Sequence, residues 1–407
     1  MKNLDVVVRI ATLTLIAVAL FLGFGLCPAS AQRVEGVFDG HRIVFPESSI
    51  PVPGRHHTNY FFVDSDQPGS APNPNDETPG SIACVYQLVT GPTGCPIATS
   101  KNVPSGGIGA IAIVDAGFYP TAQSDLNAFD AQFGIPDTTL TQVWTGTTQP
   151  PSYNDWLVEE ALDIEWAHAM APQAKLYLVV SKLCTSIKCN TDPTWAAVKK
   201  AATLVAKHGG GVVSMSFGDP EIAAETSFDT FFTHTGVVYF AASGDSGIGA
   251  SIYPGASPNV VAVGGTRFIR DQNGNFTNEM YDNGGGGNLS PFEPRPAYQD
   301  GIANIVGTKR GYPDVASNFC CAAIFLQGSW FSVGGTSWSS PTFAGIVNAA
   351  GSRQPSSNAQ LTMMYNEYAN PTEYKADFFD VTSGSSFCKI GWDLCAGIGS
   401  PRTYVGK

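Results

Sequence analysis

The sequence GGTSWSSP at positions 334–341 is the segment best suited to chemistry, because it places a serine, Ser337, among glycines and other small residues. Glycines let the backbone turn sharply and let a carbonyl group approach closely. The apolar stretch that follows predicts a helix that begins near Ser337, so that backbone N–H groups and the helix dipole point at a developing negative charge. A plain turn at a helix start is the alternative, but the motif favours a serine nucleophile.

A serine hydroxyl needs a base, and an acidic helix offers one. In WLVEEALDIEW at positions 156–166, Glu159 and Asp163 are four residues apart, so their side chains share one face of a helix. Two carboxyls in contact hold one proton between them, because a second negative charge is costly. Such a pair can accept a serine proton near the ordinary pKa of Asp and Glu, where an imidazole is already protonated. A solvated helix face is the alternative for these residues taken alone.

A third acidic residue, Asp245, stands in ASGDSG at positions 242–247, directly after the apolar run 237–241. We expect that run to be a strand, with the Asp245 carboxyl at its C-terminal end. Subtilases have an amide at this place, which donates a hydrogen bond to the oxyanion. A carboxyl can donate only when it is protonated. The base pair and this donor would therefore need the same acid pH, although an ordinary aspartate in a turn is the simpler alternative.

A histidine base is the rival interpretation. Asp115 in IVDAG resembles the aspartate that subtilisin-like enzymes place on their first strand. Such a site also needs a histidine that is followed by glycine and a small residue on a helix. The histidines lack that context, including His168 and His208, whose replacement by alanine would test this alternative. They stand at positions 41, 56, 57, 168, 208 and 234.

Strands that alternate with helices must position these groups. Apolar runs predict strands at 109–115, 175–181, 211–216 and 236–242, and amphipathic stretches predict helices at 121–134, 154–170, 193–208 and 221–233. This alternation predicts the α/β class, with a parallel sheet and helices on both faces. Functional residues in such sheets gather at the carboxyl ends of the strands.

With these motifs in this order, the chain resembles the sedolisin family of serine-carboxyl peptidases, whose fold is subtilisin-like. The likeness runs from TPGSI at 78–82 to GSP at 399–401. It implies peptide hydrolysis through an acyl-enzyme, in which Glu159 takes the proton of Ser337 and Asp163 orients Glu159. Protonated Asp245 would join the Ser337 backbone N–H in binding the oxyanion. A secreted, catalytically silent binding protein on the same fold remains an alternative.

The resemblance also implies two binding elements. A strand that pairs with the substrate backbone falls on Ser216, Phe217 and Gly218. One Ca²⁺ ion is expected near the C-terminus, where two Asp carboxylates and three backbone carbonyls would supply the hard oxygen ligands that calcium prefers. Those residues are Asp380, Val381, Lys389, Gly391 and Asp393, with Lys389 where the family tends to have glycine.

The N-terminal part of the chain is expected to hold two segments that precede the peptidase domain at 78–407. Residues 1–31 are typical of a signal peptide, with an apolar run at 10–26 and ASA at 29–31 before the cleavage point. An uncleaved membrane anchor is the alternative. Residues 32–77 are rich in Pro, Ser, Asn and Asp, which predicts an extended arm or linker. The family usually carries a large folded propeptide, for which this arm is too short.

The cysteines and the charge indicate where the protein acts. Without the cysteine of the leader, eight cysteines remain, and an even number suits an oxidising compartment. Their spacing suggests the pairs Cys84–Cys95, Cys184–Cys189 and Cys388–Cys395. Adjacent Cys320 and Cys321 form a bridge or stay reduced. A zinc site is the rival, but paired CxxC motifs with a nearby histidine are missing.

Acidic residues outnumber basic residues 34 to 22, for a formal net charge of -12. This balance argues against a nucleic-acid partner, because phosphate binding needs a basic surface. From the leader and the cysteines, we expect a secreted, periplasmic or extracellular protein without membrane contact after the leader is removed. The resemblance implies peptides or proteins as substrates, and we expect a monomer.

Overall fold

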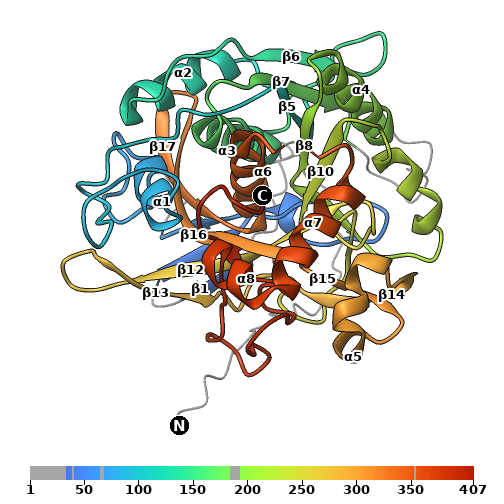
Figure 1. The fold of residues 1–407 in the computed structure, drawn as a ribbon. Coiled ribbons are helices and arrows are strands. Elements are labelled where there is room, and N and C mark those ends of the chain that lie inside the picture. Colours follow the sequence, from blue (N-terminus) through green and yellow to red (C-terminus); the bar gives the residue numbers. More distant parts are fainter. Residues whose placement is uncertain (1–33, 39–40, 65–67, 184–192, 353) are drawn as a thin grey trace, which may run out of the picture. The chain divides into compact units, whose positions relative to one another are not determined.

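Parallel strands form the centre of the fold in the computed structural model, which describes residues 34–38, 41–64, 68–183, 193–352 and 354–407 (Figure 1). In spatial order these strands are β16 (Val315–Leu326), β12 (Val261–Arg270), β10 (Val237–Ala242), β8 (Gly211–Met215), β5 (Ala110–Ala116), β7 (Lys175–Ser181) and β6 (Thr141–Trp144). Beyond β16 the sheet continues with antiparallel strands, which are β17 (Ser329–Gly334), β4 (Phe61–Val63), β2 (His41–Phe45) and β1 (Val34–Phe38). The predicted parallel sheet is therefore extended by an antiparallel edge.

Helices cover both faces of the parallel strands (Figure 1). Side chains alternate between the two faces of a strand. In β5, Ile111 and Ile113 pack in the core around helices α3 and α6, whereas Ala112 and Val114 pack in the core below helix α4. The predicted α/β class is confirmed. The helices are α1 (Pro79–Val85), α2 (Ala122–Phe133), α3 (Asn154–Met170), α4 (Pro193–Lys207), α5 (Ala303–Val306), α6 (Thr336–Ala350), α7 (Ser357–Ala369) and α8 (Pro371–Asp377).

The predicted helix at 221–233 is wrong, because this region forms only two short 3-10 turns, Glu225–Ser227 and Asp229–Phe232. Its aromatic side chains crowd around Trp195 instead of following a helical period. The other predicted helices and strands are confirmed to within a few residues. The remaining strands are β3 (His57–Thr58), β9 (Phe217–Pro220), β11 (Ile252–Tyr253), β13 (Phe276–Tyr281), β14 (Asn288–Pro294), β15 (Lys309–Tyr312), β18 (Phe378–Phe379) and β19 (Ser400–Pro401).

The segment 32–77 is not the extended arm that its composition predicts, since its strands belong to the sheets of the main body. β4 pairs with β2 on one side and with β17 on the other. Its side chains alternate, so that Phe61 and Val63 pack with Phe319 on one face, while Phe62 packs in the main core on the other. The average composition of the segment is polar and therefore does not reveal the short apolar strand β4 within it.

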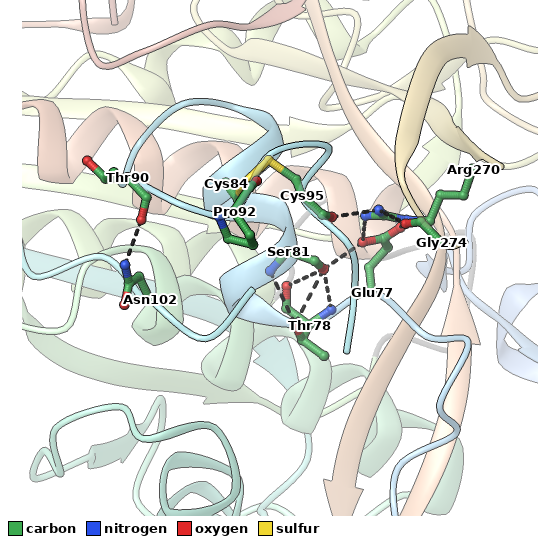
Figure 2. The surroundings of a disulfide bond; sticks show 10 residues. All are labelled: Glu77, Thr78, Ser81, Cys84, Thr90, Pro92, Cys95, Asn102, Arg270 and Gly274. Carbon is green, nitrogen blue, oxygen red and sulfur yellow. Dashed lines mark hydrogen bonds and ion pairs between the residues drawn. A yellow bond between two sulfur atoms is a disulfide. The ribbon is translucent and has the colours of Figure 1, made fainter. Parts of the chain in front are cut away.

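Disulfides close several loops of the described chain. Cys84 bonds Cys95 and Cys388 bonds Cys395, so these two predicted pairings are confirmed. For Cys320 and Cys321, where a bridge and reduced thiols were both open, the structure has the bridge. Figure 2 shows the first of them, in which Cys84 stands in the last turn of α1. Thr78 and Ser81 form a capping box at the start of the same helix.

Two predictions fall outside the described residues, namely the leader at 1–31 and the pair Cys184–Cys189. Within the described residues, no helix combines the length and the apolar character needed to cross a membrane. The membrane expectation is thus tested only for that part of the chain.

Candidate active site

Ser337 lies in the first turn of α6, directly after a sharp backbone turn at Gly335. Gly335 has a φ of 133°, and a Cβ atom at this position would lie 2.1 Å from the Asn59 carbonyl oxygen. Glycine is therefore required here, both by conformation and by the close approach. The Ser337 hydroxyl donates a hydrogen bond to the Ser216 carbonyl oxygen at 3.2 Å. The predicted position of Ser337 at the start of a helix is confirmed.

Glu159 lies in the middle of α3, which packs directly against α6, and its side chain is fully buried. Burial and the charge of Asp115 raise the pKa of Glu159 well above its ordinary value. The Ser337 hydroxyl and the Asn59 backbone lower the pKa, but more weakly. Neither carboxyl oxygen of Glu159 has a hydrogen-bond partner among the described residues, and the group keeps a proton to higher pH than an exposed glutamate does.

Asp163 lies one helical turn after Glu159 and is also fully buried. Its Oδ1 accepts a hydrogen bond from the Ser216 hydroxyl at 2.8 Å. Burial raises the pKa of Asp163 well above its ordinary value, and the charges of Asp115 and Glu159 add to this effect. The two carboxyls thus compete for protons in a space that disfavours a second negative charge.

Asp115 is a further member of this carboxyl cluster, beyond the three acidic residues that the motifs predict. It lies at the C-terminal end of β5, fully buried, and burial raises its pKa to about 8. Its charge also raises the pKa of Glu160, which is buried on the same helix as Glu159. The signal in the sequence is the position of Asp115 at the end of a predicted strand, which by itself points only to the rival Ser-His-Asp site.

Asp245 follows β10, and its side chain contacts Thr336, the residue before Ser337. Its Oδ1 accepts hydrogen bonds from the Thr336 N–H at 2.8 Å and from the Thr336 hydroxyl at 2.7 Å. A Cβ atom on Gly335 would lie 2.6 Å from its Oδ2. Burial raises the pKa of Asp245 well above its ordinary value, more than these hydrogen bonds lower it. A protonated Oδ2 could donate a hydrogen bond to an oxygen next to Gly335.

The strand predicted to bind substrate is β9, and Phe217 and Gly218 lie in it. Here it pairs with the chain's own β3, in antiparallel register, with His57 opposite Gly218 and Thr58 opposite Phe217. The neighbouring Asn59 side chain donates a hydrogen bond to the Ser216 carbonyl oxygen at 2.7 Å. Nothing in the sequence around Asn59 predicts that this segment lies at the site.

The histidines do not supply a base for Ser337. His168 contacts Asp130, with 3.3 Å between Nε2 and Oδ2, and His208 Nε2 lies 2.6 Å from the Tyr177 hydroxyl. Within the described part of the chain, no hydrogen bond joins Ser337 to a histidine. The geometry therefore gives no support to the Ser-His-Asp alternative.

The loop expected to hold calcium is closed by the Cys388–Cys395 disulfide. Asp393 accepts hydrogen bonds from three backbone N–H groups of this loop, and Asp380 Oδ2 accepts one from Gly391 at 3.0 Å. Burial and, more weakly, the charge of Asp380 raise the pKa of Asp393 to about 6. Two carboxylates in one loop are hard oxygen ligands of the kind that calcium prefers, and in this structure their oxygens accept hydrogen bonds from backbone N–H groups.

The cysteines of that loop do not suit zinc. Among the described residues, the group that could bring three metal-binding atoms together is Cys388, Asp393 and Cys395. Both cysteines are oxidised in one disulfide, which removes the thiolates that zinc requires.

The chain is similar to several known proteins over most of its length. Kumamolisin from Bacillus sp. (strain MN-32) is 31% identical over 375 residues, which cover 81% of this chain and 62% of that protein. Sedolisin from Pseudomonas sp. (strain 101) is 25% identical over 357 residues, which cover 76% and 59%. The chain thus spans about three fifths of the length of these two relatives. No protein-family model matches the chain.

The solved structures give the same fold. Pseudomonas sedolisin, a serine-carboxyl proteinase complexed with two molecules of pseudo-iodotyrostatin, aligns with a TM-score of 0.65 at 22% identity. The alignment covers 80% of this chain and 95% of that chain. Sphericase aligns with a TM-score of 0.52 at 20% identity, over 80% and 99% of the two chains. At these identities the likeness concerns the fold, which is subtilisin-like.

Proposed function

We propose that this chain, which belongs to the sedolisin family of serine-carboxyl peptidases, hydrolyses peptide bonds in acid through an acyl-enzyme on Ser337. The observation that carries the proposal is the meeting of Ser337 with buried carboxyls from separate elements. Glu159 and Asp163 come from α3, whereas Asp245 comes from the turn after β10.

Each of these groups has a chemical task in the proposed reaction. Glu159 accepts the Ser337 proton, and Asp163 stabilises the charge that forms on Glu159. The Ser337 Oγ attacks the peptide carbonyl, whose oxygen becomes negative and accepts hydrogen bonds from the Ser337 N–H and protonated Asp245. Glu159 then gives the proton to the leaving amine, and water resolves the acyl-enzyme by the same route.

The raised pKa values fix the direction of the pH dependence. The reaction needs Glu159 and Asp163 to share one proton, and it needs Asp245 to hold its own. Activity should therefore fall as the pH rises through the raised pKa of Asp245, because the ionised carboxyl repels the oxyanion. Activity should also fall at the acid end, where the pair takes up a second proton and Glu159 can no longer accept the serine proton. We expect the maximum between these two limits, below about pH 5.

A pH–rate profile on a mixed peptide library, with the products sequenced, tests this function. Ser337→Ala and Glu159→Gln should each lower kcat/KM by about a thousandfold or more, with an unchanged thermal unfolding profile. Ser124→Ala, at an exposed serine of α2, is the matched control and should keep full activity. Full activity in Ser337→Ala would refute the mechanism. A correctly folded wild type without activity on any peptide would favour the silent binding protein.

Export and metal binding complete the proposal. The leader at 1–31 would direct the chain out of the cytoplasm, where the disulfides are stable and the acid medium can occur. We expect it to act there as a monomer. One calcium ion would be held by Asp380, Asp393 and the carbonyls of Val381, Lys389 and Gly391, where it would neutralise two adjacent carboxylates and tie the loop together.

A further inference from the structure

The disulfide between the adjacent residues Cys320 and Cys321 lies in the wall of a cavity of about 410 Å³. Both cysteines belong to β16 and are partly exposed. A cavity of this size has room for a small molecule. Since a thiolate must reach a sulfur atom to attack a disulfide, an exposed bridge reacts and a buried one does not. The bridge is therefore open to thiol–disulfide exchange.

A second part of the cavity wall is held in place by an ion pair. The Arg270 guanidinium donates hydrogen bonds to both carboxylate oxygens of Glu77 at 2.6 Å, and to the carbonyl oxygens of Cys95 and Gly274 (Figure 2). The Glu77 N–H in turn donates to the Cys321 carbonyl oxygen at 2.8 Å. Access to the bridge therefore does not depend on the opening of a loop.

The bridge is also close in structure to the candidate nucleophile. Cys320 lies opposite Gly334 in β17, and the register between the two strands shifts directly after this pair. The carbonyl oxygen of Phe319 accepts a hydrogen bond from the Gly335 N–H at 2.8 Å. The residue before the bridge thus anchors the sharp turn that leads into Ser337.

We propose that Cys320–Cys321 is a thiol-exchange site that a small dithiol reaches through this cavity, and that its redox state sets the activity of Ser337. The exchange goes beyond the proposed peptidase function, whereas its effect on Ser337 rests on that function.

The exchange is a balanced two-electron reaction. One thiolate of the dithiol attacks a sulfur atom of the bridge and forms a mixed disulfide, and the other cysteine leaves as a thiolate that takes up a proton. The second thiol of the dithiol loses its proton and attacks the mixed disulfide, which frees the second cysteine. The bridge thereby gains two electrons and two protons, and the dithiol is oxidised to a disulfide.

Reduction should lower the activity because it loosens β16 where this strand supports the nucleophile. Two separate thiols rotate independently, so the Phe319 carbonyl is placed less firmly than it is beside the bridge. Its hydrogen bond then holds Gly335, and hence Ser337, less tightly. A small displacement of a nucleophile costs a large part of the rate. We therefore expect the reduced form to have a lower kcat with little change in KM.

The first experiment measures the exchange without any peptidase assay. The full-length chain is incubated with dithiothreitol at about pH 7, where part of the dithiol is ionised, and free thiols are alkylated at intervals and located by peptide mass. Cys388 and Cys395 are buried and serve as the internal control. We expect Cys320 and Cys321 to be reduced at least about tenfold faster than this pair. Equal rates, or faster reduction of the buried pair, would overturn the exchange site.

The second experiment measures the effect on the candidate active site. In the selectively reduced protein, kcat at about pH 4 should fall by about tenfold or more with KM within about twofold, and reoxidation should restore it. The double variant Cys320→Ser/Cys321→Ser should have the low kcat and no response to dithiothreitol. Cys84→Ser/Cys95→Ser, which removes a different bridge, is the matched control and should still respond. An unchanged kcat after complete reduction of the Cys320–Cys321 bridge would refute the link to the nucleophile.

Amide hydrogen exchange gives a readout that needs neither a folded variant nor peptidase activity. The Gly335 amide should exchange faster in the reduced wild type than in the oxidised protein, because its acceptor is the carbonyl before the bridge. The same protection in both states would contradict the proposed coupling. If the oxidised wild type is folded but cuts no peptide, the proposed function fails, while the alkylation rates still decide whether the exchange site exists.

Discussion

Asp314 and Asp163 are both buried aspartates, but the protein neutralises them by different means. Asp314 pairs with the buried Arg310, whose guanidinium donates hydrogen bonds to its two carboxylate oxygens at 2.8 and 2.5 Å. In the described part of the chain, Asp163 and its neighbour Glu159 make no ion pair with Lys or Arg. Their neighbours are further carboxyls and hydroxyls, and burial raises the pKa of both.

The difference shows how one fold keeps acidic groups either inert or reactive. A carboxylate fixed by a guanidinium stays ionised and has no proton to exchange. A carboxyl neutralised by a proton can give that proton away and take it back. A buried acid without a cation is therefore the kind of group that can do acid–base chemistry, and it makes the protein depend on pH.

Removing the cation from Asp314 should have the largest effect on stability. Arg310→Leu would leave a buried carboxylate without its partner, which costs about 3–5 kcal/mol of unfolding free energy at pH 7. Chemical denaturation measures this loss. The matched control is Arg295→Leu, which breaks an exposed pair with Asp300 and should cost less than about 1 kcal/mol. Equal, small losses in both variants would remove the distinction between the two kinds of buried acid.

Glu279 is a buried carboxyl outside the candidate site that, like Asp163, is neutralised by a proton and not by a cation. Burial raises its pKa from 4.5 to about 7. Its contribution to stability is therefore complete below the unfolded pKa and is lost as the pH rises through the folded pKa. The loss by about pH 8 amounts to about 3 kcal/mol at most.

Stability measured between pH 4 and pH 8 tests this directly. Glu279→Gln should flatten the fall, because an amide has no proton to lose. Glu373→Gln, on an exposed glutamate of α8, should leave the curve unchanged. A fall that Glu279→Gln does not alter would assign the pH dependence to other groups.

The calcium proposal adds a metal ion as a third means of neutralising acidic groups. With calcium at about 100 times its dissociation constant, binding should stabilise the fold by about 2–3 kcal/mol, and chelation should remove this gain. Asp393→Asn should abolish the response to calcium, whereas Asp271→Asn, in an exposed turn, should keep it. Thermal unfolding with and without a chelator measures the effect. A wild type that does not respond to calcium would contradict the proposed site.

Asp245 gives the smallest but most specific effect. Asp245→Asn replaces a carboxyl that needs its proton with an amide that donates at every pH. We expect activity at pH 4 to stay within about tenfold of wild type, a change of about 1.4 kcal/mol, while the loss at higher pH moves upward. Asp245→Ala, which has no donor, should be less active than Asp245→Asn at pH 4. A pH profile identical to that of wild type would exclude a protonated Asp245 from the reaction.

Local sequence patterns predicted the parallel sheet and the relation between the main candidate residues. The helical spacing of Glu159 and Asp163 and the glycine turn before Ser337 are short-range features, so a few neighbouring residues determine them. Asp245 could be placed because it directly follows a clear strand. The positions of these side chains relative to each other depend on packing between α3 and α6. The motifs predict these relative positions only through the family resemblance.

The parts that could not be predicted depend on contacts between distant residues. Asn59 reaches Ser337 only because β3 pairs with β9 and β4 pairs with β17. Nothing in the polar surroundings of Asn59 indicates those partners. The participation of Asp115 in the carboxyl cluster likewise depends on the packing of α3 over β5, which brings its charge near Glu160.

The position of β4 between β2 and β17 has a consequence for the order of folding. Phe62 leaves the ribosome long before its partner Val333. This edge of the sheet can close only after β17 has been synthesised, and pairing over such a sequence separation is slow. The nucleophile helix α6 follows β17 directly, so the serine is assembled at the same late stage at which its own N-terminal segment can cover it.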